Sequence, residues 1–189
     1  MANNADVTYI IVSKNNQIIE QLNNAFSDMS VHDWDIYKAM ESLGINTDKL
    51  SVRAEIQDCY MALDASTITI NMIGAWSHQE DFKTAIEQRY PDEVEVYWLE
   101  YEPGCDVFMT NDTEDKYFHD NYIVDCDCQE EWYRTLDDVV EIYKDVLGEF
   151  PNGTDITFDM VKERADAYTE SNEDDCNFMY IFQLERIGC

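Results

Sequence analysis

Apolar and polar residues alternate, or recur with helical spacing, through the first two thirds of the chain. Short runs rich in β-branched and aromatic residues predict strands, whereas apolar residues at every third or fourth position predict amphipathic helices. The runs that predict strands are Thr8–Ser13, Leu50–Ala62, Thr67–Trp76 and Glu93–Tyr101. The segments with helical spacing are about Asn15–Asp28, Asp33–Leu43 and Ser77–Tyr90. Ser77 and Glu80 have capping-box spacing at the start of the last helix, and Pro91 ends it.

The order of these elements is strand, helix, strand, strand, helix, strand. It predicts an α+β fold with a ferredoxin-like βαββαβ arrangement, in which one antiparallel sheet carries helices on one face. Two further strands, about Asp106–Thr110 and Lys116–Cys126, flank an acidic turn and predict an added hairpin. We therefore expect residues 1–126 to form a ferredoxin-like core with a hairpin.

The last third of the chain has a different pattern. Thr135 and Asp138 predict the cap of a helix that Gly148 closes. A second helix is expected at about Phe158–Tyr168 and a final strand at Asn177–Arg186. This strand is apolar enough to need a partner, so residues 127–189 are predicted to be a C-terminal helix–helix–strand extension. It is expected to pack on the core and to form one compact unit with it.

The charge of the chain bears on its function more than on its fold. There are 41 acidic and 12 basic residues, a net charge of −29, whereas a magnitude of about 2–8 is enough to keep a small domain soluble. A compact chain of this length is about 40 Å across. Because duplex DNA carries one charge per ~1.7 Å, 29 charges correspond to about 50 Å of duplex. This charge excludes direct binding of nucleic acid and suggests mimicry of it.

Composition also bounds the location of the protein. Hydrophobic residues make up 45% of the chain, so it can bury a core, but no apolar run approaches the ~18 residues of a membrane span. The first residues lack the basic and apolar regions of a secretory signal. The six cysteines are therefore expected to be reduced thiols. We expect a soluble, cytoplasmic protein with no membrane partner.

Candidate metal ligands are few. Cys126, Cys128 and His119 could supply three zinc ligands, but paired zinc-binding cysteines are usually two to four residues apart. The favoured interpretation is a pair of small residues on the inward face of a strand. Asp125 and Asp127 have the spacing of a metal-binding DxD motif without the rest of a nucleotide site. The histidines accompany no nucleophile motif, so no catalytic residue, metal or cofactor is expected.

Three local features lie between about Ile70 and Asp125. They are Trp76 at the end of a strand, Tyr90 and Pro91 at the end of a helix, and the turn Glu100–Asp106. In these features the chain resembles the YubB ferredoxin-like family of plasmids, phages and other mobile elements. It departs from the family where Val107 and Phe108 replace a glycine, and it lacks the family's N-terminal Trp–Cys–Asn stretch. The resemblance implies a ferredoxin-like fold and a mobile-element origin, without established catalytic residues.

The placement of the carboxylates suggests a partner. Pairs two residues apart on strands, and a set on one helix face, would hold carboxylates at even spacing on rigid elements. A surface that mimics phosphates needs such spacing, although any solvated face also has it. The acids expected to contact a partner are Glu93, Glu95, Glu100, Glu102, Asp125, Asp127, Asp138, Glu141 and Asp145.

The leading hypothesis is a non-enzymatic inhibitor from a phage or mobile element, acting in the cytoplasm of a bacterial host cell. As a nucleic-acid mimic it would block the DNA- or RNA-binding channel of a basic defence protein, such as a CRISPR effector or a restriction enzyme. One alternative is a general protein-binding module whose acidity is incidental. Another is a metal-dependent enzyme that uses a carboxylate cluster.

Overall fold

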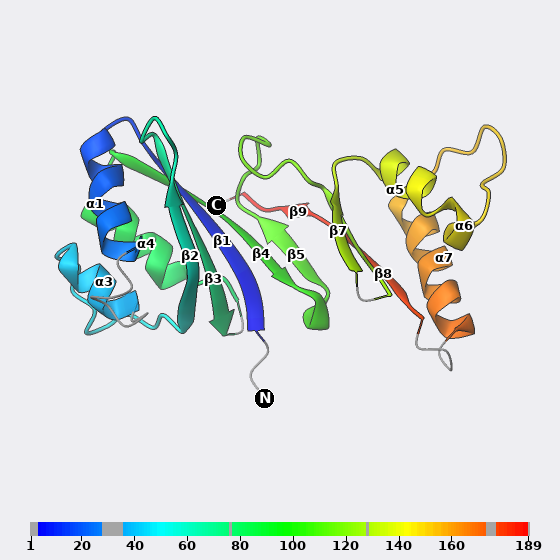
Figure 1. Ribbon diagram of the computed structural model, residues 1–189, viewed down its shortest axis with the longest axis horizontal. Helices are drawn as coiled ribbons and strands as arrows, with labels where there is room; N and C mark the ends of the chain where they lie inside the picture. The colour runs from blue at the N-terminus through cyan, green and yellow to red at the C-terminus, as the bar shows by residue number, and fades with distance from the viewer. Residues whose placement is uncertain (1–3, 28–35, 76, 128, 173–176, 189) are drawn as a thin grey trace. The chain divides into compact units, whose positions relative to one another are not determined.

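The computed structural model describes residues 4–27, 36–75, 77–127, 129–172 and 177–188 (Figure 1). The chain divides into two compact units, Met1–Tyr117 with Arg186–Cys189 and Phe118–Glu185. Each unit has its own hydrophobic core. The mixed α+β class predicted from the sequence is confirmed.

A six-stranded sheet forms the first unit. Its strands are β1 (Asn4–Ser13), β2 (Ala54–Met61), β3 (Thr67–Ala75), β4 (Val94–Glu102), β5 (Val107–Thr110) and β9 (Glu185–Arg186). They are ordered β2-β3-β1-β4-β5-β9, and the neighbours from β2 to β5 pair antiparallel. Helices α1 (Asn16–Ser27), α3 (Ile36–Ser42) and α4 (Glu80–Arg89) lie on one face of this sheet (Figure 1).

Strict alternation of side chains builds the core of the first unit. Every second residue of β1 and β3 is buried, and Ile11 on β1 lies opposite Ile68 on β3. Leu22 from α1 and Phe82 from α4 are fully buried with them. The Tyr9 ring of β1 packs against that of Phe82, with centroids 4.8 Å apart. The alternation seen in the sequence therefore orients this sheet toward its helices.

The start of α4 differs from the predicted capping box. Gln79 holds the N-cap position, and the Ser77 hydroxyl donates to the carbonyl of His78 at 3.0 Å instead of capping the helix. The Gln79 side chain is buried, where its amide donates to the Ser77 carbonyl at 2.6 Å and its oxygen accepts from the Arg53 N–H at 2.7 Å. These bonds fix Gln79 before the helix begins, so the prediction of a Ser77–Glu80 box is wrong.

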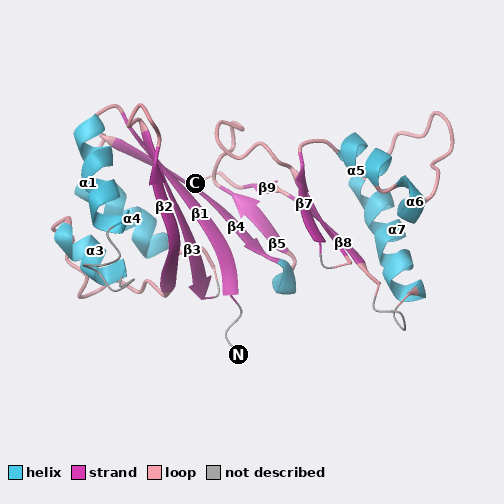
Figure 2. Ribbon diagram, viewed as in Figure 1, coloured by secondary structure: helices cyan, strands magenta, loops and turns pink. Residues whose placement is uncertain are grey.

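The second unit is a three-stranded sheet with helices on one side (Figure 2). Strands β6 (Tyr122–Cys126), β7 (Gln129–Tyr133) and β8 (Met179–Gln183) pair antiparallel in the order β7-β6-β8. The helices are α5 (Leu136–Ile142), α6 (Lys144–Leu147) and α7 (Phe158–Ser171). Val124 and Ile181 from the sheet meet Val139 and Val161 from the helices in the core. The predicted cap is confirmed, because the Thr135 hydroxyl accepts from the N–H of Asp138 at 3.2 Å.

The predicted hairpin is not formed. After β4 the chain turns through the short 3₁₀ helix η1 (Pro103–Cys105), and β5 pairs with β4, whereas β6 pairs with β7 and β8. The side chain of Asn111 extends the β4–β5 pairing, accepting from the N–H of Trp98 at 2.7 Å and donating to the carbonyl of Val96 at 2.9 Å. A short connection makes the β4–β5 pair inexpensive to close, and β6 completes a second core.

The final predicted strand is also divided. Met179–Gln183 forms β8 beside β6, and Glu185–Arg186 forms β9 at the edge of the six-stranded sheet. The N–H of Ile187 donates to the carbonyl of Thr110 at 2.8 Å. The expected division of the chain at residue 126 thus falls inside the second unit, since β6 belongs with β7 and β8.

Candidate functional site

Negative charge is densest in the second unit. Residues 118–185 contain 19 acidic and 4 basic residues, a net charge of −15. Many of the carboxylates lie on the helices, where eight of them are exposed. We call this set the acidic helix layer; its members are Asp137, Asp138, Glu141, Asp145, Asp159, Glu163, Asp166 and Glu170.

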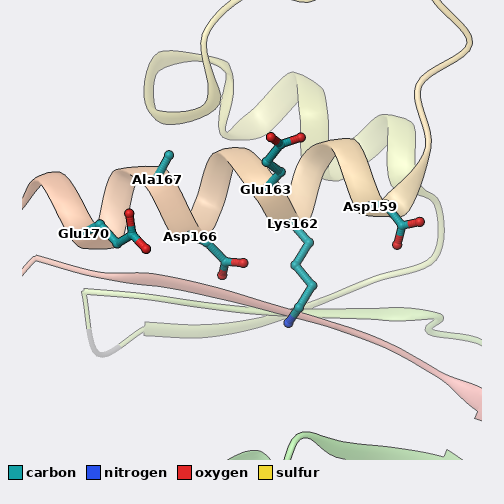
Figure 3. A pocket seen from close by; sticks show the side chains of 6 residues that line it. All are labelled: Asp159, Lys162, Glu163, Asp166, Ala167 and Glu170. Atoms are coloured by element: carbon teal, nitrogen blue, oxygen red, sulfur yellow. The ribbon is translucent and has the colours of Figure 1, made fainter.

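The α7 part of the acidic helix layer is the most regular. Its four carboxylates follow one another at four-, three- and four-residue intervals, opposite the buried Val161 and Ala165. These intervals correspond to about 4.5–6 Å along a helix axis, compared with ~3.4 Å per phosphate along one DNA strand. The four acids line a shallow depression of about 430 Å³ together with Lys162 and Ala167 (Figure 3). The stripe therefore has somewhat more than half the linear charge density of one strand.

Arg164, on the same helix as the α7 acids, makes its contacts away from the layer. The guanidinium of Arg164 donates to the carbonyls of Leu147, Gly148 and Glu149 at 2.7, 3.0 and 3.1 Å. It also lies over the ring of Phe150, 3.7 Å from its centroid. Arg164 therefore contacts backbone carbonyls at and just after the end of α6 and an aromatic ring. None of these contacts is with a carboxylate of the acidic helix layer.

Three of the predicted partner-contacting acids belong to the acidic helix layer. Asp138, Glu141 and Asp145 are exposed on α5 and α6. The Asp138 carboxylate accepts from the Thr135 hydroxyl at 2.5 Å, and that of Glu141 pairs with Lys144 at 3.1 Å. The four acids of α7 were not among the predicted contact residues, although three of them lie at helical spacing within the predicted helix Phe158–Tyr168.

Asp125 and Asp127 do not share a strand face as predicted. Asp125 is half-buried on β6, and burial, followed by the nearby Glu130, raises the pKa of its carboxyl group. Asp127 lies in the turn after β6 with a left-handed φ of 51°. Its carboxylate accepts from the N–H of Phe178 at 3.1 Å, so a backbone contact holds it. The turn explains why the strand spacing does not continue to Asp127.

Glu93 and Glu95 are exposed, as predicted, but in the first unit. They line an open depression of about 790 Å³, and the Glu93 carboxylate accepts from the side-chain amide of Asn15 at 3.2 Å. The Glu95 carboxylate accepts from the Tyr97 hydroxyl at 2.6 Å, and this bond raises the pKa of Tyr97 to about 12. The predicted acids are thus divided between the two units.

Glu100 and Glu102 correct the prediction, because they are only 3% and 4% exposed. They share the face of β4 that buries Val96 and Trp98, two positions apart along the strand. The Glu100 carboxylate accepts from the N–H of His78 at 2.8 Å and lies 2.7 Å from its ring Nδ1. Carboxylates on this face cannot contribute to an acidic surface.

His78, for which the sequence predicted no catalytic role, lies beside a depression. Its ring stacks on that of Trp98, with centroids 3.7 Å apart and planes 7° from parallel. Its Nε2 lies 3.5 Å from a carboxylate oxygen of Glu80, on the other side from Glu100. The depression beside it, about 360 Å³, is also lined by Arg53 and Ser77. The arrangement holds one imidazole between two carboxylates.

The part of the chain that the structure describes contains no cluster of side chains suited to bind a metal ion. Among those residues, no group of three or more His, Cys, Asp or Glu side chains could hold a metal ion. Cys128, one of the three candidate zinc ligands, lies outside the described residues. No helix among them combines the length and apolar character that crossing a bilayer requires.

Comparisons with known proteins add little to this geometry. No family model and no curated protein matches the chain. Among solved structures, the chain is similar to an unknown protein from Galdieria sulphuraria at 11% identity, over 96% of this chain and 98% of that one. The TM-score is 0.27, too low to support a shared fold or function.

Proposed function

We propose that the protein is a non-enzymatic inhibitor that mimics nucleic acid. Its target would be the DNA- or RNA-binding channel of a basic bacterial defence protein, a CRISPR effector or a restriction enzyme, and its origin a phage or mobile element. The observation that carries the proposal is the net charge of −15 over residues 118–185, with eight exposed carboxylates on three helices.

The mechanism follows from this charge. A dense negative field attracts a basic channel over distances of about a Debye length, ~10 Å at 0.1 M salt, and raises the association rate. Once docked, carboxylates on rigid helices compete with phosphates for the same Lys and Arg side chains. Side chains already ordered on helices lose less conformational entropy on binding than those of a disordered acidic tail would.

For the first unit we propose a ferredoxin-like arrangement and membership of the YubB family. The order β2-β3-β1-β4, with antiparallel pairing throughout and helices after β1 and β3, supports the arrangement. The motif residues around Tyr90 and Glu100–Asp106 support the family. Neither proposal assigns chemistry to the unit, which leaves the acidic helix layer as the functional surface.

The proposal is tested by competition. The protein would be titrated into complexes of basic nucleases with labelled DNA or RNA, across a salt series. We expect displacement of nucleic acid from at least one CRISPR effector or restriction enzyme, weakening as salt rises. Displacement from none of them, or binding that is insensitive to salt, would contradict the proposal.

A charge-matched pair of variants identifies the surface responsible. Neutralising the α7 stripe (D159N, E163Q, D166N, E170Q) is expected to weaken competition at least tenfold. The control neutralises two Asp and two Glu exposed in the first unit (E20Q, D48N, E55Q, D58N), with at most a threefold loss. Equal losses would assign the effect to bulk charge. Full competition by both variants would favour a general binding module in which acidity is incidental.

A further inference from the structure

The sheet of the second unit has a face opposite its helices, and this face carries aromatic and acidic residues. Val124 and Ile181 point into the helix-covered core, so the residues that alternate with them point the other way. In register, Asp125 lies between Glu130 on β7 and Tyr180 on β8. Two residues along, Trp132 on β7 lies opposite Ile123 on β6, and Ile123 is fully buried on this same face. Asp125 thus has Glu130 and Tyr180 as direct cross-strand neighbours and Trp132 as a diagonal neighbour.

Asp125 is the unusual member of this group. It is half-buried, and the described part of the chain provides no hydrogen bond or ion pair to its carboxylate. Its cross-strand neighbour Glu130 carries the same charge, and like charges at opposed positions destabilise a sheet. Consistent with this, burial and Glu130 raise the pKa of Asp125. A bound cation would offset both the cost of burying this charge and its repulsion from Glu130.

The two aromatic side chains are exposed beside these carboxylates. Trp132 is 40% and Tyr180 46% exposed, which is high for residues of their size on a sheet. The indole N–H of Trp132 donates to the Glu130 carboxylate at 3.0 Å, which fixes ring and carboxylate together. The Tyr180 ring lies 5.3 Å from that of Phe178, centroid to centroid. Trp and Tyr are the residues most enriched at the energetic centres of protein interfaces.

We infer that this face, with Asp125 and Glu130 between Trp132 and Tyr180, binds an arginine side chain of a basic partner protein. A guanidinium is planar, stacks on aromatic rings and offers five donors that can reach two carboxylates at once. The ammonium of lysine is a point charge and meets these demands less well. The inference rests on the proposed function for the class of partner, and it adds a specific anchor on the sheet face opposite the acidic helix layer.

The test uses the full chain and two peptide probes, nona-arginine and nona-lysine. Binding is followed by the indole N–H resonance of Trp132 in NMR spectra, assigned with Trp132→Phe. Nona-arginine is expected to shift this resonance saturably and to bind at least fivefold more tightly than nona-lysine. Asp125→Asn is expected to weaken nona-arginine binding about tenfold. Asp166→Asn removes the same charge from α7 and is expected to weaken it less than twofold.

The outcomes separate the inference from the function on which it rests. Equal losses for Asp125→Asn and Asp166→Asn, equal affinity for the two peptides, or an unmoved Trp132 resonance would overturn the arginine site. If the α7 variant still impaired competition with nucleic acid, the proposed function would stand without it. Conversely, a confirmed arginine site in a protein that displaces no nucleic acid would overturn the proposed function alone. Asp125→Asn should fold, because it removes a destabilising charge.

Discussion

Buried and half-buried carboxylates in this protein differ in whether donors reach them. Asp112 is fully buried in the first unit, and its carboxylate accepts from the backbone N–H groups of Lys116 at 3.0 Å and Tyr117 at 2.7 Å. Glu100 is also buried, and its carboxylate accepts from the backbone N–H of His78 and lies beside the ring Nδ1 of the same residue. Asp125 is half-buried beside Glu130. Backbone N–H donors reach the first two carboxylates, whereas no donor among the described residues reaches that of Asp125.

One chemical change should therefore have opposite effects at two positions. Asp125→Asn is expected to stabilise the second unit at pH 7 by a few tenths of a kcal/mol to about 1 kcal/mol, because it removes a like-charge cross-strand pair. Asp112→Asn is expected to destabilise the first unit by about 1–3 kcal/mol, because a neutral amide replaces a charged acceptor of two hydrogen bonds. Urea unfolding of each variant measures the change.

The pH dependence of the Asp125→Asn effect follows from the raised pKa of Asp125. With a folded-state pKa above the unfolded value, ionisation costs stability as pH rises through the folded pKa. The advantage of the variant should be full at neutral pH and vanish below the unfolded pKa of ~3.9, where both states are protonated. An advantage that persists at pH 3 would show that charge is not its cause.

At the scale of elements, Arg164 joins α7 to the end of α6. Its guanidinium donates to the carbonyl of Leu147 at the end of α6 and to those of Gly148 and Glu149 just after it, and it covers the ring of Phe150. Gly148 follows α6 with a φ of 71°, a conformation that side chains disfavour, so the chain leaves the helix sharply at this point. Arg164 is thus a structural cation in a predominantly acidic unit.

Replacing this cation should unfold the junction rather than alter the acidic surface. Arg164→Met keeps the apolar stem but loses the donors, and a cost of about 1.5–3 kcal/mol is expected from hydrogen bonds to a charged group. Lys144→Met is the matched control, since its exposed pair with Glu141 should contribute less than about 1 kcal/mol. Thermal unfolding of the two variants compares them. A similar, small effect in both would mean that the Arg164 contacts add no stability.

The sequence predicted elements well where local patterns decide them. Alternation located β1, β3 and β4, and the Thr135 cap located α5, because each depends on neighbouring residues alone. The predicted pairing of β5 with β6 was wrong, because the choice of neighbouring strands depends on long-range packing. It also depends on contacts such as those of Asn111. Burial of Glu100 could have been read from its parity with Val96 and Trp98. The group around Asp125 could not, because it needs the register of three strands.

At the scale of the whole molecule, charge is distributed unevenly along the chain. The first unit holds 22 acidic and 8 basic residues, a net charge of −14 over 121 residues, whereas the second has −15 over 68. Self-repulsion destabilises a compact state, and its cost rises steeply with charge density. The second unit therefore folds against a larger electrostatic cost, which a basic partner would relieve.

Added salt should reduce the electrostatic self-repulsion that destabilises both units. Raising ionic strength from 0.01 to 0.1 M shortens the Debye length from ~30 to ~10 Å, which screens repulsion between carboxylates on different elements but not between adjacent ones. We expect the unfolding temperature to rise with NaCl, and the transition of the second unit to rise more than that of the first. Each 1 kcal/mol of relieved repulsion corresponds to about 4–8 °C in a unit of this size. The two transitions would be separated by calorimetry, with circular dichroism of Trp98 and Trp132 variants to assign them.

A comparison of NaCl and KCl at equal ionic strength is the control. Screening does not depend on the identity of the cation, whereas stabilisation by a bound ion would. A fall in the unfolding temperature between 0.01 and 0.1 M would mean that attractive ion pairs dominate, such as that of Arg186 with Asp115 at 2.8 Å. Equal shifts in both transitions would mean that repulsion between carboxylates destabilises the second unit no more than the first. In either case the acidic helix layer would lose its distinction as a surface held ready for a basic partner.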